Sequence, residues 1–410
     1  MSTAQPRGTE SSLSRNLRVL ATRNFLYGLR MNMMRAVWQP FVLHLGASMS
    51  LLGLLEAIGG FGGIVSTATL PLSGWLSDRR GRKPLVRLSH AFAATALLTF
   101  IIAGWVREWL LLLPGVVLLG LTAIARPAAD SMVAESATPD ARGRAFSLTG
   151  MAFAASGVFA PTLGGFLAER YGFLIVLATG IVLELVTLAV VASALRETLQ
   201  LDNRAPLIAS DFLGLLGSIM KPPTRLRSFY VAVAVDMFAF GAGSAILPGL
   251  LTETYHFTPF QLGLMSSVTS ATWALSQLFF GRQVDKRGCV PFLILSEAIG
   301  AVVTGAWLVI QSFEAFLILQ VLWGLVPAMW VPAFLAWIAN SVPESQRAEE
   351  IGRLGAFRGL LSFPAPYVGG LLYELVGFRG PILANMIGAA MVVVLVWLFV
   401  GEPQSCGDAV

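Results

Sequence analysis

The sequence predicts an all-α membrane protein with twelve transmembrane helices, arranged as two pseudo-symmetric six-helix bundles. Three observations lead to this prediction: an apolar composition, long apolar stretches at regular intervals, and an internal repeat. Hydrophobic residues make up 56% of the 410 residues, charged residues only 12%, and the mean hydropathy is +0.73. A soluble protein carries about 25% charged residues, so the composition excludes an ordinary soluble domain.

Twelve apolar stretches are about 18 residues long or longer, the length that an α-helix needs to cross a bilayer. The first is the least apolar, since Arg30, Asn32, Arg35 and Gln39 interrupt it. We expect the spans at residues 24–45, 50–74, 84–105, 109–134, 144–168, 172–195, 228–250, 259–281, 291–312, 314–340, 350–373 and 379–401.

Polar segments divide the chain around these spans. The longest connection contains the amphipathic piece "DFLGLLGSIM" and ends in "KPPTRLR", which is typical of a linker with a surface helix. The predicted organisation is a cytoplasmic tail (1–23), an N-terminal bundle (24–195), a cytoplasmic linker (196–227), a C-terminal bundle (228–401) and a second cytoplasmic tail (402–410).

The Lys and Arg residues decide the expected orientation. The N-terminal segment, the even-numbered connections and the linker carry 22 of the 28 Lys and Arg residues, whereas the opposite side carries only Arg107, Arg170 and Arg379. Short loops rich in Lys and Arg stay in the cytoplasm. We therefore expect a multi-pass protein of the cell membrane (inner or plasma membrane) with both termini cytoplasmic.

The sequence lacks the motifs of nucleic-acid-binding proteins, metalloproteins and enzymes. The basic residues form short clusters between apolar runs, a pattern that favours lipid headgroups over nucleic acid. The two cysteines, Cys289 and Cys406, have no metal-ligand neighbours, the three histidines are scattered, and no Walker loop or Ser/His/Asp arrangement is present. We expect no enzyme, no cofactor and no metal site.

The two halves of the chain repeat each other at an offset of about 205–210 residues. "GWLSDRRGRKP" from Gly74 returns as "GRQVDKRGCVP" from Gly281, and "LSHA" (Leu88–Ala91) returns as "LSEA" (Leu295–Ala298). "APTLGGFLAERYGF" returns as "APYVGGLLYELVGF". Three matches in the same order predict two six-helix units related as the parallel halves of a transporter.

With these motifs the sequence resembles a major facilitator superfamily transporter and is similar to the drug:proton antiporter branch. The loop signature G-x-x-x-D-R-x-G-R is matched by Gly74, Asp78, Arg79, Gly81 and Arg82. "GVFAPTLGG", from Gly157 to Gly165, resembles the antiporter signature of the fifth helix, with Ala160 in place of one glycine. The family's fourth-helix signature is replaced by "LLPGVVLLG".

The resemblance implies a latch between the halves near the cytoplasm. Asp78 is expected to meet the N-terminus of the eleventh helix near Gly352–Gly355, where the helix dipole and free amides favour a carboxylate. Arg82 is expected to bond to Glu135, which stands shortly before Arg142. Such a latch holds the outward-open state. The expected latch residues are Gly74, Asp78, Arg79, Gly81, Arg82, Glu135 and Arg142, with Asp285 as a weaker counterpart.

Ionisable residues inside spans are functional candidates because burying a charge in a bilayer is costly. Asn32, Arg35 and Gln39 share one face of the first helix, and Arg35 is expected to point into a central cavity. Arg126 and Asp130 stand one helical turn apart on the fourth helix. They either line the cavity or neutralise each other.

Asp236 lies in the middle of the seventh span, and the family arrangement turns helices 1, 4, 7 and 10 toward the cavity. We expect Asp236 to alternate between a protonated form and a form paired with Arg35 or Arg126. Glu184 in the sixth span is expected to be a second titrating site or a buried, hydrogen-bonded acid.

Charged residues nearer the span ends receive simpler interpretations. Arg30 is expected to snorkel toward the cytoplasm. Glu56 and Glu297 are expected to be wetted, and nothing marks His90, which aligns with Glu297, as a ligand.

Aromatic and small residues complete the candidate sites. Trp323, Trp330 and Trp337 stand seven apart, with Phe334 between the last two, which indicates either a packing face or an aromatic cavity wall. Small residues and prolines permit close, bent helix contacts and are expected to form the gates, at Gly157, Pro161, Gly164, Gly165, Pro366, Gly369 and Gly370.

The expected function is secondary active transport by alternating access, in which a monomer exports an amphipathic or hydrophobic small molecule in exchange for protons. The alternative keeps the fold but changes the substrate to an organic anion or lipid headgroup, clamped by Arg35 and Arg126, because arginine commonly binds carboxylate and phosphate.

Overall fold

The computed structural model describes residues 7–60, 63–138, 141–199, 223–343 and 347–403, and the side chains of most of them. The described residues form helices joined by short turns, and no strand occurs among them. The amphipathic piece of the linker, residues 211–220, lies outside the described residues.

The N-terminal half supplies the first six spans. The first span is longer than expected, since its helix already begins at Arg7 and no proline interrupts it before Pro40. The six spans are α1 (Arg7–His44); α2 (Met49–Gly59) with α3 (Ile64–Arg80); α4 (Lys83–Val106); η1 (Trp109–Leu111), α5 (Leu112–Leu121), η2 (Thr122–Ile124) and α6 (Ala125–Glu135); α7 (Arg142–Tyr171); and α8 (Phe173–Ala194).

The C-terminal half supplies the other six. They are η5 (Thr224–Leu226), α10 (Arg227–Ala242), η6 (Ser244–Ile246) and α11 (Leu247–Tyr255); α12 (Pro259–Arg287); α13 (Val290–Trp307); α14 (Phe313–Ser341); α15 (Arg347–Ser362) with α16 (Ala365–Val376); and α17 (Arg379–Phe399). Breaks such as those near Gly60 and Pro364 are tolerated in a membrane where neighbouring helices cover the backbone.

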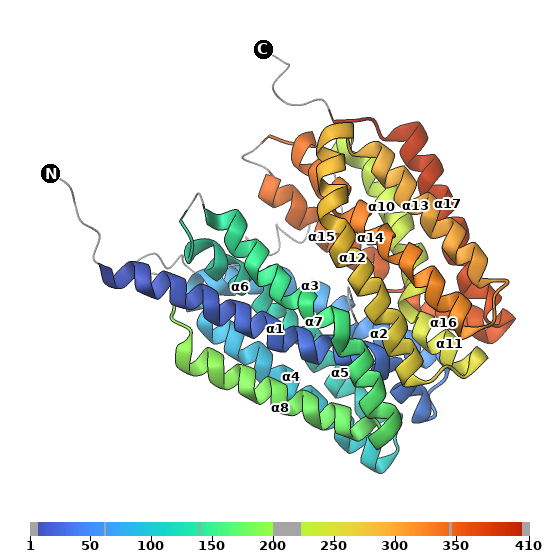
Figure 1. The fold of residues 1–410 in the computed structure, drawn as a ribbon, viewed down its shortest axis with the longest axis horizontal. Helices are drawn as coiled ribbons and strands as arrows, with labels where there is room; N and C mark the ends of the chain where they lie inside the picture. The colour runs from blue at the N-terminus through green and yellow to red at the C-terminus, as the bar shows by residue number, and fades with distance from the viewer. Residues whose placement is uncertain (1–6, 61–62, 139–140, 200–222, 344–346, 404–410) are drawn as a thin grey trace.

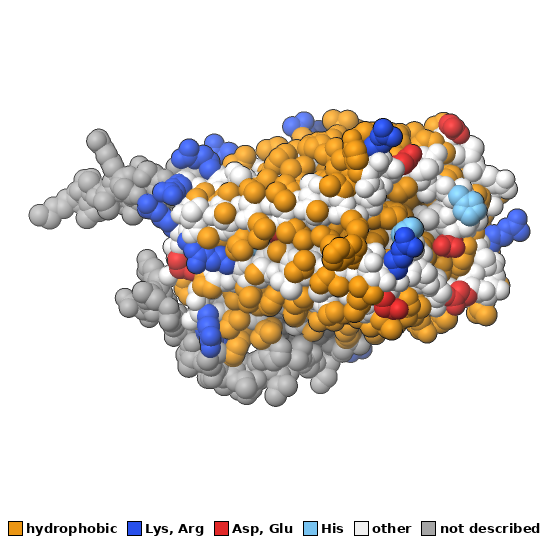
Figure 2. All heavy atoms as spheres, turned by 90° about the horizontal axis from the view of Figure 1, so that it is seen from below, with side chains coloured by type: hydrophobic (Ala, Val, Ile, Leu, Met, Phe, Trp, Pro, Cys, Tyr) orange, Lys and Arg blue, Asp and Glu red, His pale blue; other side chains and the backbone are white. Residues whose placement is uncertain are grey.

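A broad apolar surface surrounds the bundle. Among the described residues, nine helical segments are long and apolar enough to cross a membrane. The other three spans are α1, α12 and α15 with α16, which carry more polar residues. Figure 2 shows hydrophobic side chains over the middle of one face, with most charged side chains toward its ends. This distribution fits a protein whose middle faces lipid.

The two halves meet at one end of the molecule. Figure 1 shows the two bundles converging away from the chain termini and separating toward them. We call these the far end and the terminal end. Helix α7 packs on α12, and α2 packs on α16. One apolar core at the far end contains residues of both halves, including Phe41 and Leu52 with Leu250 and Phe316.

Candidate functional site

The polar face of α1 points toward the other half of the molecule. Asn32 is buried and donates from Nδ2 to Ser156 Oγ of α7 at 3.1 Å. Gln39 is also buried: its Nε2 donates to Glu56 Oε1 at 2.9 Å and to the Ala245 carbonyl at 2.7 Å. Its Oε1 accepts the Gly249 N–H at 2.8 Å. With these bonds Gln39 ties the halves together at the far end and is not free to bind a ligand.

Arg35 stands on the same face between Asn32 and Gln39, and it is exposed. Because Gln39 on the same face contacts the C-terminal half, we infer that Arg35 faces the space between the halves. No described residue forms a hydrogen bond or ion pair with it.

Helix α6 brings Arg126 and Asp130 to the same region. Both side chains are exposed, and no ion pair joins them in the described part of the chain. Arg126 lies within electrostatic range of Asp130 and of Arg358 on α15, so it faces the C-terminal half. Because Arg126 interacts with both residues, lining the cavity and neutralising Asp130 both stay predictions.

Asp236 on α10 is only 9% exposed, and its Oδ2 has no hydrogen-bond partner among the described residues. Its cationic neighbour is Arg358, whereas Arg35 and Arg126 were expected. Arg358 Nη2 lies 3.2 Å from Met237 Sδ, and its guanidinium lies 4.8 Å from the centre of the Phe334 ring. Arg358 was missed from the sequence because this residue was counted only with the Lys and Arg residues of the cytoplasmic connections.

Glu297 on α13 is 6% exposed, so the expectation that water covers it was wrong. It lies two turns inside the helix, where α14 and α17 pack against α13. Glu297 also lies within electrostatic range of Asp236. Two acids of the C-terminal half are therefore buried close together.

Glu184 belongs to a buried network in the N-terminal half, away from the other half. Arg30 Nε donates to Glu184 Oε1 at 2.7 Å, and His90 Nδ1 lies 2.6 Å from Glu184 Oε2. Arg23 Nε donates to His90 Nε2 at 3.0 Å, which leaves the imidazole proton on Nδ1 for Glu184. The snorkelling expected of Arg30 was wrong, since α4 and α8 offer it a partner inside the bundle.

Trp330 and Phe334 are buried in the core of the C-terminal half. Phe334 lies 5.7 Å from Phe229, ring centre to ring centre, and Trp337 stacks on Phe229 at 4.0 Å. This favours the packing alternative for the stripe. Phe334 also supports Arg358, so it still borders the central site.

Three of the latch arginines have described contacts within their own half. Arg82 forms the expected ion pair with Glu135, Arg79 lies over the Trp75 ring, and Arg142 Nε donates to the Ala134 carbonyl at 3.2 Å. Asp285 is exposed, and a Cβ on Gly74 would meet open space. The side chain of Asp78 lies outside what the structure describes. The expected helix N-terminus near Gly352–Gly355 was wrong, since α15 already begins at Arg347.

A second capping contact, not foreseen from the sequence, appears at the same place in both halves. The Glu197 carboxylate accepts the N–H groups of Arg82 and Lys83 at the start of α4. Glu402 does the same for Cys289 and Val290 at the start of α13. Burial opposes ionisation of Glu197, but these and two further backbone N–H groups hold its pKa below the usual range. The repeat could have predicted these contacts, because one glutamate follows the last helix of each half.

Each of the two caps also requires a glycine. Gly81 has a φ of +94° and Gly288 a φ of +89°, values that favour glycine. A Cβ on either would meet the capping carboxylate. This explains why the glycine recurs in both copies of the loop signature.

The predicted gate glycines lie at close helix contacts that repeat between the halves. A Cβ on Gly164 would meet the Met33 backbone of α1, and one on Gly369 would meet the Ala242 backbone of α10. A Cβ on Gly165 would meet the Pro259 carbonyl.

The fourth glycine and the two prolines complete the same pattern across the far end. A Cβ on Gly370 would meet the Met49 carbonyl, and Pro161 and Pro366 approach Gly263 and Gly53 with their carbonyls. Gly157 lies beside Ser270 of α12. The first glycine of each pair packs a half together, and the second joins the halves.

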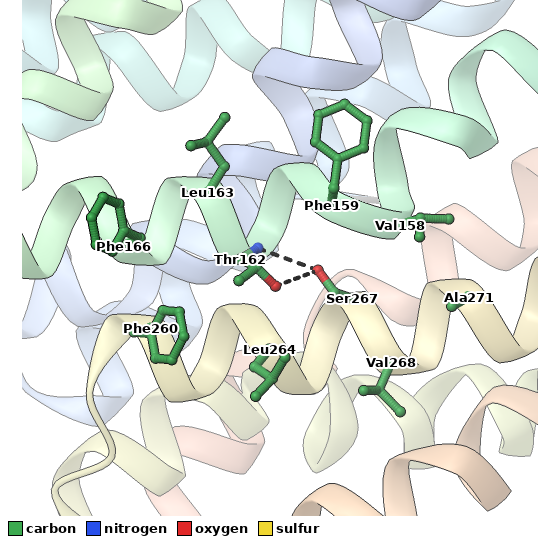
Figure 3. A pocket seen from close by; sticks show the side chains of 10 residues that line it. All are labelled: Val158, Phe159, Thr162, Leu163, Phe166, Phe260, Leu264, Ser267, Val268 and Ala271. Carbon is green, nitrogen blue, oxygen red and sulfur yellow. Dashed lines mark hydrogen bonds between the residues drawn. The ribbon is translucent and has the colours of Figure 1, made fainter.

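An apolar groove of about 570 Å³ opens beside this junction. Figure 3 shows Phe159, Leu163 and Phe166 of α7 along one side and Phe260 and Leu264 of α12 along the other. Thr162 and Ser267 are hydrogen bonded between them. None of the predicted cavity residues lines this groove, so it is distinct from the central site.

Known proteins resemble this chain over most of its length. The "Multi-drug resistance efflux pump PmrA homolog" of Lactococcus lactis is 24% identical over 349 residues, 82% of each chain. "Multidrug resistance protein MdtG" of Yersinia enterocolitica is 23% identical over 379 residues, 89% of this chain and 88% of the relative.

The crystal structure of "the human organic anion transporter MFSD10 (TETRAN)" is 20% identical, with a TM-score of 0.67 over 96% of this chain and all of the other; at that identity the likeness shows the fold. The family model "Major Facilitator Superfamily" matches residues 20–242 and 229–408. The chain, with its two repeated bundles, therefore belongs to the Major Facilitator Superfamily of transporters.

Proposed function

We propose that this transporter exports an amphipathic or hydrophobic small molecule across the cell membrane in exchange for protons, by alternating access. The observation that carries the proposal is Asp236, a buried carboxylate with an unpartnered oxygen, facing Arg358 beside the space between the halves. Such a carboxylate can exchange a proton for the arginine as its surroundings change. The similarity to multidrug efflux pumps supports the substrate class.

The arrangement of the halves supports alternating access. The far end is held by Gln39, by the glycine contacts and by the Ser50 N–H, which donates to Glu374 Oε1 at 3.0 Å. If the terminal end is cytoplasmic, as the Lys and Arg distribution predicts, this state opens toward the cytoplasm. Arg35 and Arg126 are exposed in it and would meet substrate first.

Transport in proteoliposomes tests the proposal. Purified protein is reconstituted, a pH gradient is imposed, and uptake of cationic, neutral and anionic amphipathic dyes is followed. We expect gradient-driven movement of at least one cationic or neutral dye, lost in Asp236→Asn and retained in Asp285→Asn, which removes an exposed acid of the same half. Equal transport by both variants would refute the role of Asp236.

A second candidate substrate is an organic anion. Three arginines, Arg35, Arg126 and Arg358, border the central space. Among the side chains that the structure describes there, Asp130 is the one exposed carboxylate. Arginine suits carboxylate and phosphate ligands, and the structurally similar human MFSD10 is an organic anion transporter. Movement of anionic dyes alone, abolished by Arg35→Ala and kept by Arg170→Ala, would establish this candidate in place of the first.

A further inference from the structure

The internal repeat allows the positions of the two acids of the C-terminal half to be compared with the corresponding positions in the N-terminal half. His90 and Glu297 occupy the same position in "LSHA" and "LSEA". The segments "ERYGF" and "ELVGF" align α8 with α17, so Ala389 takes the place of Glu184. The glycine contacts align Met33 of α1 with Ala242 of α10, and Asp236 then takes the place of Tyr27.

This alignment indicates how Asp236 and Glu297 face each other. The Tyr27 ring meets the His90 ring edge-on, with 6.5 Å between their centres. The corresponding positions in the C-terminal half hold the two acids, which interact electrostatically. In the N-terminal half the Glu184 carboxylate bridges His90 and Arg30, whereas a methyl group stands at Ala389 and bridges nothing.

The charges around the acid pair do not balance two carboxylates. Arg358 of α15 is the cation near Asp236, whereas the charged group near Glu297 is Asp236 itself. Arg126 of α6 lies within electrostatic range of Arg358. The other titratable residues of α13, α14 and α17, Glu314 and Arg379, lie in the first turns of α14 and α17. Tyr230 of α10 bonds to Glu350 near the terminal end. Two carboxylates sharing one site in a low dielectric do not both ionise readily.

We propose that Asp236 and Glu297 together hold one proton and form the proton-binding site of this transporter. The inference rests on the proposed proton coupling but names a second acid for it. The proton enters and leaves as a solvent proton, and Arg358 compensates the remaining negative charge. The unpartnered Oδ2 of Asp236 is the atom available to share the proton.

Infrared difference spectroscopy tests the pair without a substrate. The full-length protein in lipid is titrated with acid and base, and the C=O stretching band of protonated carboxyl groups is followed. Replacing one acid by its neutral amide removes the repulsion that favours the proton on the other. The pH midpoint of the remaining band should therefore fall by about one unit or more in Glu297→Gln. The double variant with Asp236→Asn should lose the part of the band that these two acids contribute.

Matched variants keep the result interpretable. Asp285→Asn should leave the band and its midpoint unchanged. Should Glu297→Gln fail to fold, Glu297→His, which copies the N-terminal half, replaces it and should show the same fall. An unchanged midpoint in either folded variant overturns the pair. The proposed coupling is tested separately. If the pair titrates as described but Asp236→Asn still moves dye when a pH gradient is imposed, the proposed proton coupling is overturned and the acid pair is not.

Discussion

The two halves of this transporter share one arrangement of helices but differ in the charged side chains that they bury. In the N-terminal half, Arg30, His90 and Glu184 close a network in which each buried polar group has a partner. In the C-terminal half, Asp236 and Glu297 are buried with one oxygen unpartnered. The duplication therefore fixed the helix contacts and left the buried charges free to diverge.

This difference separates a structural role from a functional one. A satisfied buried network stabilises the packing of α1, α4 and α8 and resists any change of protonation. An unsatisfied carboxylate costs stability, and its retention points to a function. Three pairs of substitutions, one member in each half, test where the halves differ and where they are alike.

The largest effect is expected for Glu184→Gln. Removing this carboxylate leaves Arg30 buried without its counter-charge, and breaking a buried ion pair costs about 3–5 kcal/mol. Thermal unfolding of the detergent-solubilised protein measures the loss. Asp236→Asn is the matched change in the other half and should leave the unfolding temperature the same or higher, because it removes the repulsion between two buried acids. Equal losses in both variants would contradict the contrast.

Substitutions at the second glycine of each pair should affect conformation in both halves alike. In Gly165→Ala and Gly370→Ala the new methyl group meets a carbonyl of the opposite half. Overpacking of this kind costs about 1–3 kcal/mol, and it should shift the population toward states with the far end open.

Spin labels at the exposed residues Arg170 and Glu253, one on each half, report this opening as a longer distance. Gly355→Ala is the control, since its Cβ would meet no atom within 4 Å. A population shift in only one of the two glycine variants would show that the junctions are not equivalent.

The smallest effect is expected for the capping glutamates. Glu197→Gln and Glu402→Gln should each lower the free energy of unfolding by about 0.5–2 kcal/mol, the range for a helix N-cap. Since the folded-state pKa of Glu197 is below its usual range, its contribution is complete above the unfolded pKa and disappears as the pH falls through the folded value. The gap between wild type and Glu197→Gln should therefore close on acidification; a constant gap would argue against ionisation of Glu197.

Predictions made from local pattern held for the fold and failed for several charges. The apolar lengths gave the spans, and the repeat anticipated the paired glycine contacts. The assignments of Arg30 and Glu297 were wrong because both residues were placed by their distance from a helix end. Arg358 was missed because it was counted only with the Lys and Arg residues of the cytoplasmic connections. Distance along one helix does not say which neighbouring helix offers a partner.

The sequence alone determined the number of spans, the duplication and the glycines at tight contacts, because these follow from helix length, hydropathy and the absence of a side chain. Only the tertiary structure decided which charges are satisfied. Partners such as Glu184 for Arg30, or Arg358 for Asp236, lie more than a hundred residues apart, and helix packing alone brings them together.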